Sequence, residues 1–406
     1  MNTTPDAVAP LIADTMEIIR RLSFPRLTGT PGEDQAAQEI TRILEERYIS
    51  FAEEEFTAGT FYMRVLNRLF FPIIGILMIA IFLFNIFGLP VVSVALSIFG
   101  ILLSARIHLI IPWVLAKSVD LGKKLHSKNF VFSVGSSAAA VTSTKDAIIL
   151  YFLAHWDSKT ERNPVWYLFL VIIVGEILNL EFCLHFLIAT AAAGFGFTTN
   201  PWVFVYGAVL GALTLPQLLN AMSNKSAGSL DNASGVAICI ALAEHFLQRP
   251  PPANVALTFV LTGMEEFGDK GARKFLTGHR QEIDTARAHF IALDTIGDGN
   301  TIYINRHGLF PVKESDPALA AAIEQVKTAN RGHFEHAVSQ YLPPSPAITD
   351  AVPFEQAHFK TLVVASGTFK THSFRDTIEA VDPARVSECI NLLISTIEWL
   401  GNTDLK

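Results

Sequence analysis

Residues 147–158 read AIILYFLAHWDS, an apolar run that ends in a polar turn containing His155 and Asp157. A short apolar run bounded by polar residues predicts a strand buried on both faces, as in parallel sheets. Segments of strand and helix character alternate along the chain: strands at 51–56, 254–262, 288–294 and 361–365, and helices at 11–22, 33–47, 232–247 and 384–400. This alternation predicts an α/β fold with a mixed, mainly parallel sheet sandwiched by helices.

The composition indicates a membrane and argues against nucleic acid. Of the 406 residues 50% are hydrophobic and 17% are charged, whereas soluble domains are nearer to a quarter charged. The formal net charge of −7 gives a nucleic-acid partner no electrostatic support. Cys183, Cys239 and Cys389 are far apart in the sequence, and we interpret them as small apolar side chains rather than as a disulfide framework.

Five segments place acids or histidines at predicted strand ends or in loops. They are AHWDS with His155 and Asp157, LDNASG with Asp231, TGMEEFG with Glu265 and Glu266, ALDTIGDG with Asp294, and THSFRDT with His372. Buried carboxylates are costly unless they are paired or bind a metal, and imidazole and carboxylate are the usual ligands of catalytic zinc. Each segment alone is a weak signal, since DNASG also suits a helix N-cap and an EE pair is usually solvated.

Together, and in this order, the five segments resemble the di-zinc (co-catalytic) aminopeptidase family of metallopeptidases, which includes bacterial leucyl aminopeptidase and aminopeptidase Y. The family motifs run HxD, DNASG, EE, a strand-end Asp, and a late His followed by DT. PRLTGTPGE at 25–33 and TDAVPF at 349–354, which is similar to the family's SDHxPF, extend the match. The resemblance covers residues 1–60, about 118–160 and 225–406.

The resemblance implies a zinc exopeptidase fold, a peptide substrate and two Zn²⁺ ions. It implies these ligands: Asp231 bridging both ions, His155 and Asp294 completing one site, and Glu266 and His372 completing the other. Glu265 would be the general base, and Asp157 would hold the ring of His155. Two departures stand out: a long apolar stretch separates HxD from DNASG, and Ala351 replaces the histidine of SDHxPF.

Two stretches of the sequence between the motifs are strongly apolar. Residues 69–87 carry no charge and have the length of a bilayer-spanning helix, and more apolar runs follow at 91–116, 165–197 and 202–219. Because the motif-bearing segments must share one domain, each insertion should cross the bilayer an even number of times. We therefore expect this organisation: a peptidase domain formed by 1–66, 118–163 (with His155) and 223–406, a transmembrane hairpin at 67–117, and a transmembrane insertion at 164–222. The run 165–197 is long for one span and short for two, so we expect it to be tilted or broken.

Basic residues predict the orientation. They flank the apolar runs on the catalytic side: Arg64, Arg68, Lys117, Lys123, Lys124, Lys159, Arg162 and Lys225. The turns at 88–90 and 198–201 carry no such residues, so the positive-inside rule predicts a multi-pass membrane protein with a cytoplasmic catalytic domain.

Within the third run, Glu176, Glu181 and His185 are either functional intramembrane groups or groups at a helix break or helix contact. Of the remaining histidines, His307 is the best candidate for a substrate contact.

Two other functions stay open. A non-catalytic scaffold or binding protein could keep the fold, although six costly groups would then be retained without a purpose. A carboxypeptidase or a glutaminyl cyclase could use the same site. The side-chain preference, the native metal and the oligomeric state stay undetermined at this level.

Overall fold

The computed structural model describes residues 5–117, 119–135, 147–192, 205, 209, 212–308, 312–342 and 349–402. The chain divides into two compact units, which are described separately. The sheet unit comprises residues 1–60, 115–160 and 223–406, and the helical unit comprises residues 61–114 and 161–222.

Within the described residues, the sheet unit contains one nine-stranded sheet, with the order β1-β2-β6-β3-β7-β11-β8-β10 and with β9 paired to β8. The strands are β1 (Phe51–Gly59), β2 (Lys124–Val134), β3 (Ile148–His155), β6 (Val255–Thr262), β7 (Ala288–Asp294), β8 (Thr301–His307), β9 (Lys313–Glu314), β10 (Ala337–Leu342) and β11 (Lys360–Ser366). The four central strands β6, β3, β7 and β11 are mutually parallel, whereas β2 and β8 run antiparallel to them. The prediction of a mixed, mainly parallel sheet is confirmed.

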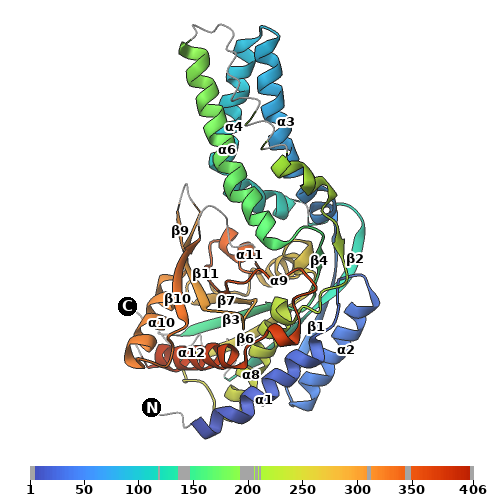
Figure 1. Cartoon of the computed structure of the whole chain (residues 1–406). Helices are drawn as coiled ribbons and strands as arrows, with labels where there is room; N and C mark the ends of the chain where they lie inside the picture. The colour runs from blue at the N-terminus through green and yellow to red at the C-terminus, as the bar shows by residue number, and fades with distance from the viewer. Residues whose placement is uncertain are drawn as a thin grey trace. The chain divides into compact units, whose positions relative to one another are not determined.

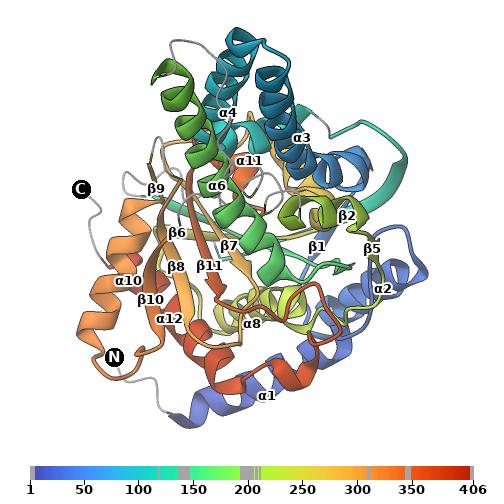
Figure 2. The same ribbon diagram turned by 45° about the horizontal axis from the view of Figure 1, so that its top comes forward.

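The sheet has an apolar core on each face, because successive side chains of a strand point to opposite sides. Along β3, Leu150 and Phe152 pack into one core, and Ile149 and Leu153 pack into the other. Five helices contribute to the first core: α1 (Pro5–Leu22), α2 (Pro31–Glu46), α8 (Ser234–Gln248), α10 (Pro317–Ala329) and α12 (Pro383–Gly401). Two helices cover the second: α9 (Lys270–His279) and α11 (Val352–Gln356) (Figures 1 and 2).

The helical unit is built from three long apolar helices (Figure 1). They are α3 (Asn67–Ile86), α4 (Pro90–Lys117) and α6 (Val165–Ala192). Short elements flank them: η1 (Tyr62–Leu66), β4 (Thr160–Glu161), η2 (Leu215–Leu219) and β5 (Met222–Ser223). Gly100 of α4 lets α6 approach closely, since a Cβ at that position would lie 2.7 Å from Cys183 Sγ.

Of the two alternatives for the third apolar run, the break is absent from the part that the structure describes, because α6 is one continuous helix over 165–192, and the tilt stays a prediction. Glu181 and His185 are exposed on it, whereas the side chain of Glu176, residues 193–197 and most of the fourth run lie outside the described residues. Among described residues, one helical stretch is long and apolar enough to cross a membrane, Ser229–Gln248, and it is 83% buried as the core helix of the sheet unit. The apolar stretches Pro72–Ile86, Pro90–Leu103 and Ile177–Ala192 are shorter.

Both insertions leave and re-enter the sheet unit at neighbouring points. Next to the first insertion, the Gly59 amide donates to the Val119 carbonyl at 2.7 Å, and the Thr60 amide donates to the Lys123 carbonyl at 3.0 Å. Next to the second insertion, the Lys225 amide donates to Thr160 Oγ1 at 3.0 Å. The first insertion therefore stands where the antiparallel pair β1–β2 would otherwise have a turn.

Candidate metal centre

The candidate site lies at one edge of the sheet because four parallel strands end there. His155 is the last residue of β3, and Asp294 is the last residue of β7. Glu265 and Glu266 lie in η4 (Glu265–Phe267), directly after β6, and the loop that follows β11 carries His372. Asp231 lies in η3 (Ser229–Ala233), which leads into α8.

Two groups of potential ligands meet at Asp231. His155 Nε2 lies 3.1 Å from Asp231 Oδ1 and 3.7 Å from Asp294 Oδ1. His372 Nε2 lies 3.0 Å from the other oxygen, Asp231 Oδ2, and 3.4 Å from Glu266 Oε2. In each group of three residues, the potential ligand atoms lie within 4.8 Å of one another. The structure thus brings together all five residues that the sequence selects as ligands.

These residues fit two divalent cations that share one carboxylate. The donors are imidazole nitrogens and carboxylate oxygens, the set found in catalytic zinc sites. Glu266 Oε1 and Asp294 Oδ1 are buried and have no hydrogen-bond partner, a costly state that a bound cation would relieve. The two carboxylate oxygens of Asp231 each face a different histidine, as expected of a bridging ligand.

Glu265 lies beside the first group and is held through its backbone. Its Oε2 is 3.9 Å from His155 Nε2. The Asp157 carboxylate accepts hydrogen bonds from the amides of Glu265 at 3.1 Å and Glu266 at 3.2 Å, which fixes the turn that presents both side chains. His155 Nδ1 lies closer to the Asp157 carbonyl oxygen, at 3.2 Å, than to its carboxylate, at 3.6 Å. Asp157 therefore orients the Glu265–Glu266 turn as well as the His155 ring.

Asp376 is a supporting residue to which sequence reasoning assigned no role. Its carboxylate accepts hydrogen bonds from the amides of Leu230 at 2.6 Å and Asp231 at 3.2 Å, so it positions the shared ligand. Burial, and then the nearby charge of Asp231, raise the pKa of Asp376 to about 7. Asp376 is the D of the DT that follows the late histidine in the motif, so the sequence did contain a signal for this residue.

Arg26, in the PRLTGTPGE segment, was also missed. Its guanidinium is fully buried and donates to carbonyl oxygens in three separate parts of the sheet unit. The acceptors include Leu22 at 2.7 Å, Trp156 at 2.6 Å, Ala227 at 2.6 Å and Gly228 at 2.7 Å. Arg26 therefore ties the end of α1 to the loop after His155 and to the loop before Asp231.

The electrostatics of the cluster are dominated by buried carboxylates. Burial raises the pKa of Glu265 well above its ordinary value, although His155 partly opposes the shift. Burial acts in the same direction on Glu266, but the ammonium of Lys159 and the ring of His372 together outweigh it, so the pKa of Glu266 lies below its ordinary value. Burial alone would lower the pKa of His155, but the surrounding carboxylates, Glu265 first, raise it well above its ordinary value.

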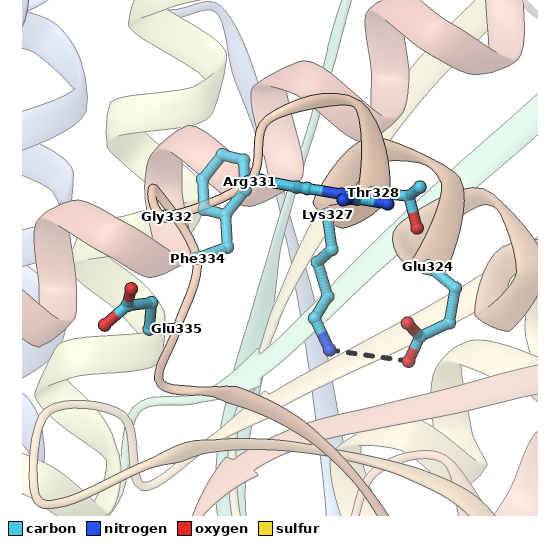
Figure 3. Close-up of a pocket in the computed structure, with 7 residues that line it drawn as sticks. All are labelled: Glu324, Lys327, Thr328, Arg331, Gly332, Phe334 and Glu335. Atoms are coloured by element: carbon cyan, nitrogen blue, oxygen red, sulfur yellow. Dashed lines mark hydrogen bonds and ion pairs between the residues drawn. The ribbon is translucent and has the colours of Figure 1, made fainter.

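His307 and an open hollow lie away from this site. His307, the suggested substrate contact, pairs with Glu355 at 3.0 Å. It is the last residue of β8, which runs antiparallel to β11, so His307 lies at the opposite end of the strands from the candidate ligands. Ala351 is buried just before α11. An open hollow of about 310 Å³ lies at the end of α10 and is lined by Glu324, Lys327, Thr328, Arg331, Gly332, Phe334 and Glu335 (Figure 3). None of the candidate ligands lines that hollow.

Comparisons with solved structures show the same fold. An aminopeptidase from Aneurinibacillus sp. strain AM-1 has a TM-score of 0.54 at 12% identity, covering 95% of this chain and 93% of that chain. BSAP, a zinc aminopeptidase from Bacillus subtilis, has a TM-score of 0.52 at 11% identity, covering 95% and 94%. A glutaminyl cyclase from an Acidobacteriales bacterium has a TM-score of 0.54 at 14% identity, covering 99% and 97%. A search of curated proteins by sequence gave no match.

The fold, the ligand arrangement and the sequence together define the class of protein, a metallopeptidase with a zinc aminopeptidase fold. Residues 209–397 match the sequence model of Peptidase family M28. The segment contains Asp231, Glu265, Glu266, Asp294 and His372, whereas His155 precedes it.

Proposed function

We propose that this protein is a membrane-anchored exopeptidase that uses two zinc ions, and that it acts as an aminopeptidase on peptides. The observation that carries the proposal is the pair of ligand groups that share Asp231, with the carboxylate of Glu265 beside them. His155 and Asp294 would hold one ion, Glu266 and His372 the other, and Asp231 both. A scaffold that had lost catalysis would have no need for this arrangement of buried charges.

When bound, two zinc ions act as Lewis acids and bring the pKa of water towards neutrality. The protein's own contribution is proton transfer. The Glu265 carboxylate accepts the proton of the attacking water and delivers it to the nitrogen of the departing amine. Asp157 keeps that carboxylate in place through the amide of Glu265, and Asp376 does the same for Asp231.

The purified protein is expected to hydrolyse aminoacyl-nitroanilides, to hold about two zinc ions per chain, and to lose activity on chelation. Activity should return when zinc is restored, which metal analysis and a chromogenic assay would follow together. A well-folded protein that neither binds zinc nor hydrolyses any aminoacyl substrate would favour the scaffold instead.

Cyclisation of N-terminal glutamine is a second candidate, because a glutaminyl cyclase shares the fold over nearly the whole chain. Peptides that begin with glutamine separate the two reactions, since a cyclase releases ammonia without cutting a peptide bond. Peptides with a blocked amino terminus test the carboxypeptidase alternative, because only a carboxypeptidase would shorten them.

We further propose that α3, α4 and α6 anchor the protein in a bilayer, with the sheet unit on the cytoplasmic side. The apolar composition of these helices supports insertion in a bilayer, and the neighbouring ends of the first insertion suit the two crossings of α3 and α4. The neighbouring ends of the second insertion call for one crossing besides α6, for which the sequence offers the apolar run 202–219. The basic residues Lys117, Lys123 and Lys124 lie next to the end of α4, as the positive-inside rule requires of cytoplasmic flanks.

Protease treatment of sealed vesicles tests this orientation. In right-side-out vesicles the sheet unit is expected to survive proteolysis, and it should be digested once detergent opens them. Digestion in intact right-side-out vesicles would reverse the orientation, and release of the protein by alkaline carbonate would rule out a membrane-spanning anchor.

A further inference from the structure

Lys159 is a buried lysine inside the ligand cluster, and the functions above do not use it. It follows His155 and Asp157 in the loop after β3, and its residue is 7% exposed. Its ammonium lies 3.0 Å from Glu266 Oε2, the same oxygen that lies 3.4 Å from His372 Nε2. The other oxygen, Glu266 Oε1, is buried and has no hydrogen-bond partner.

The ligand cluster that Lys159 reaches through Glu266 carries several buried acidic groups. Asp157, Asp231, Glu265 and Glu266 are all less than a tenth exposed. Bringing such carboxylates together without a cation is strongly unfavourable, because each loses its hydration and repels the others. A buried ammonium in direct contact with one of them offsets part of that cost.

A zinc ion and the Lys159 ammonium would compete for the negative charge of the Glu266 carboxylate. A zinc ion bound to Glu266 would lie about 2 Å from a carboxylate oxygen, within a few ångströms of the Lys159 ammonium. Two cations at that separation in a buried site repel each other strongly enough to lower the affinity for zinc at least about tenfold.

We propose that Lys159 is a built-in counter-cation that stabilises the metal-free site and weakens metal binding by the group of Asp231, Glu266 and His372. This inference rests on the proposed function, since it presupposes that metal binds there. The two cation sites would then differ in affinity, and the protein would fold before it receives metal.

The test compares Lys159→Met with Lys159→Gln, which keeps a hydrogen-bond donor but removes the charge. Lys128→Met is the matched control, since the Lys128 side chain pairs with Glu53 at 2.5 Å across strands β1 and β2 and not with a candidate ligand. The measurements are the melting temperature of the metal-free protein, zinc content per chain, and zinc affinity by competition with a chelating dye.

Both Lys159 variants are expected to melt about 5–10 °C lower than wild type without metal. They should also bind the weaker zinc at least about tenfold more tightly, while Lys128→Met behaves as wild type. A Lys159 variant that folds only when zinc is present would support the proposal further. Unchanged zinc affinity, or weaker binding, in both Lys159 variants would overturn it. Absence of zinc from wild type itself would instead refute the proposed function.

Discussion

Glu265→Gln is expected to lower kcat for an aminoacyl-nitroanilide by about 10²–10⁴-fold, while the zinc content stays that of wild type. The amide of glutamine occupies nearly the same volume but cannot accept and return a proton. Neither candidate group of ligands includes Glu265, and its backbone amide would still bond to Asp157. The loss should therefore fall on kcat, with KM almost unchanged.

The adjacent residue supplies the matched control. Glu266→Gln makes the same chemical change one position along, but in a residue placed as a ligand, so it should lose zinc as well as activity. Metal analysis beside steady-state kinetics separates the two roles. If Glu265→Gln kept most of its activity, Glu265 would not be the general base.

The second large effect is expected from Asp231→Ala. Because both groups of ligands include Asp231, its removal should weaken zinc binding at both by at least about 100-fold and leave no measurable hydrolysis. Asp294→Ala should affect one group only and leave about one zinc per chain. Zinc content after dialysis against a weak chelator distinguishes these results.

A surface aspartate controls for the loss of negative charge. Asp284 is only partly buried, and its carboxylate caps a nearby turn by accepting a hydrogen bond from the Ala286 amide. Asp284→Ala should keep its zinc and its activity. Equal zinc loss from Asp231→Ala and Asp294→Ala would mean that Asp231 is not shared between the two ions.

The strands that carry the ligands were predictable because each is a short apolar run that is buried at all or nearly all of its positions. β3 and β6 are buried at every position, and β7 at all but its last. Strands β10 and β2 were not predicted: β10 is partly exposed and mixes polar with apolar residues, and β2 follows the helical unit and is buried at only some of its positions. For such strands, pairing with neighbours decides the conformation more than local sequence does.

The residues selected from the motif order are the ones that the structure brings together, and Asp157 was selected as a support, whereas two other supporting residues were missed. Arg26 acts through backbone carbonyls of residues distant in sequence, such as Trp156 and Gly228, and carbonyls carry no sequence signal. Asp376 acts through backbone amides in the same way. Lys159 was read only as a flanking positive charge, because nothing in the sequence indicates that its side chain turns inward.

The ladder between β1 and β2 has a practical consequence for handling this protein. Residues 59 and 124 are paired across it, so the ends of the first insertion are already as close as the ends of a hairpin. Loop-closure entropy changes only slowly with loop length. Replacing the first insertion with a short glycine-containing turn should therefore change the stability of the sheet little. On the membrane anchoring proposed above, a shortened gene of this kind would yield a protein that lacks the first of its two anchoring insertions.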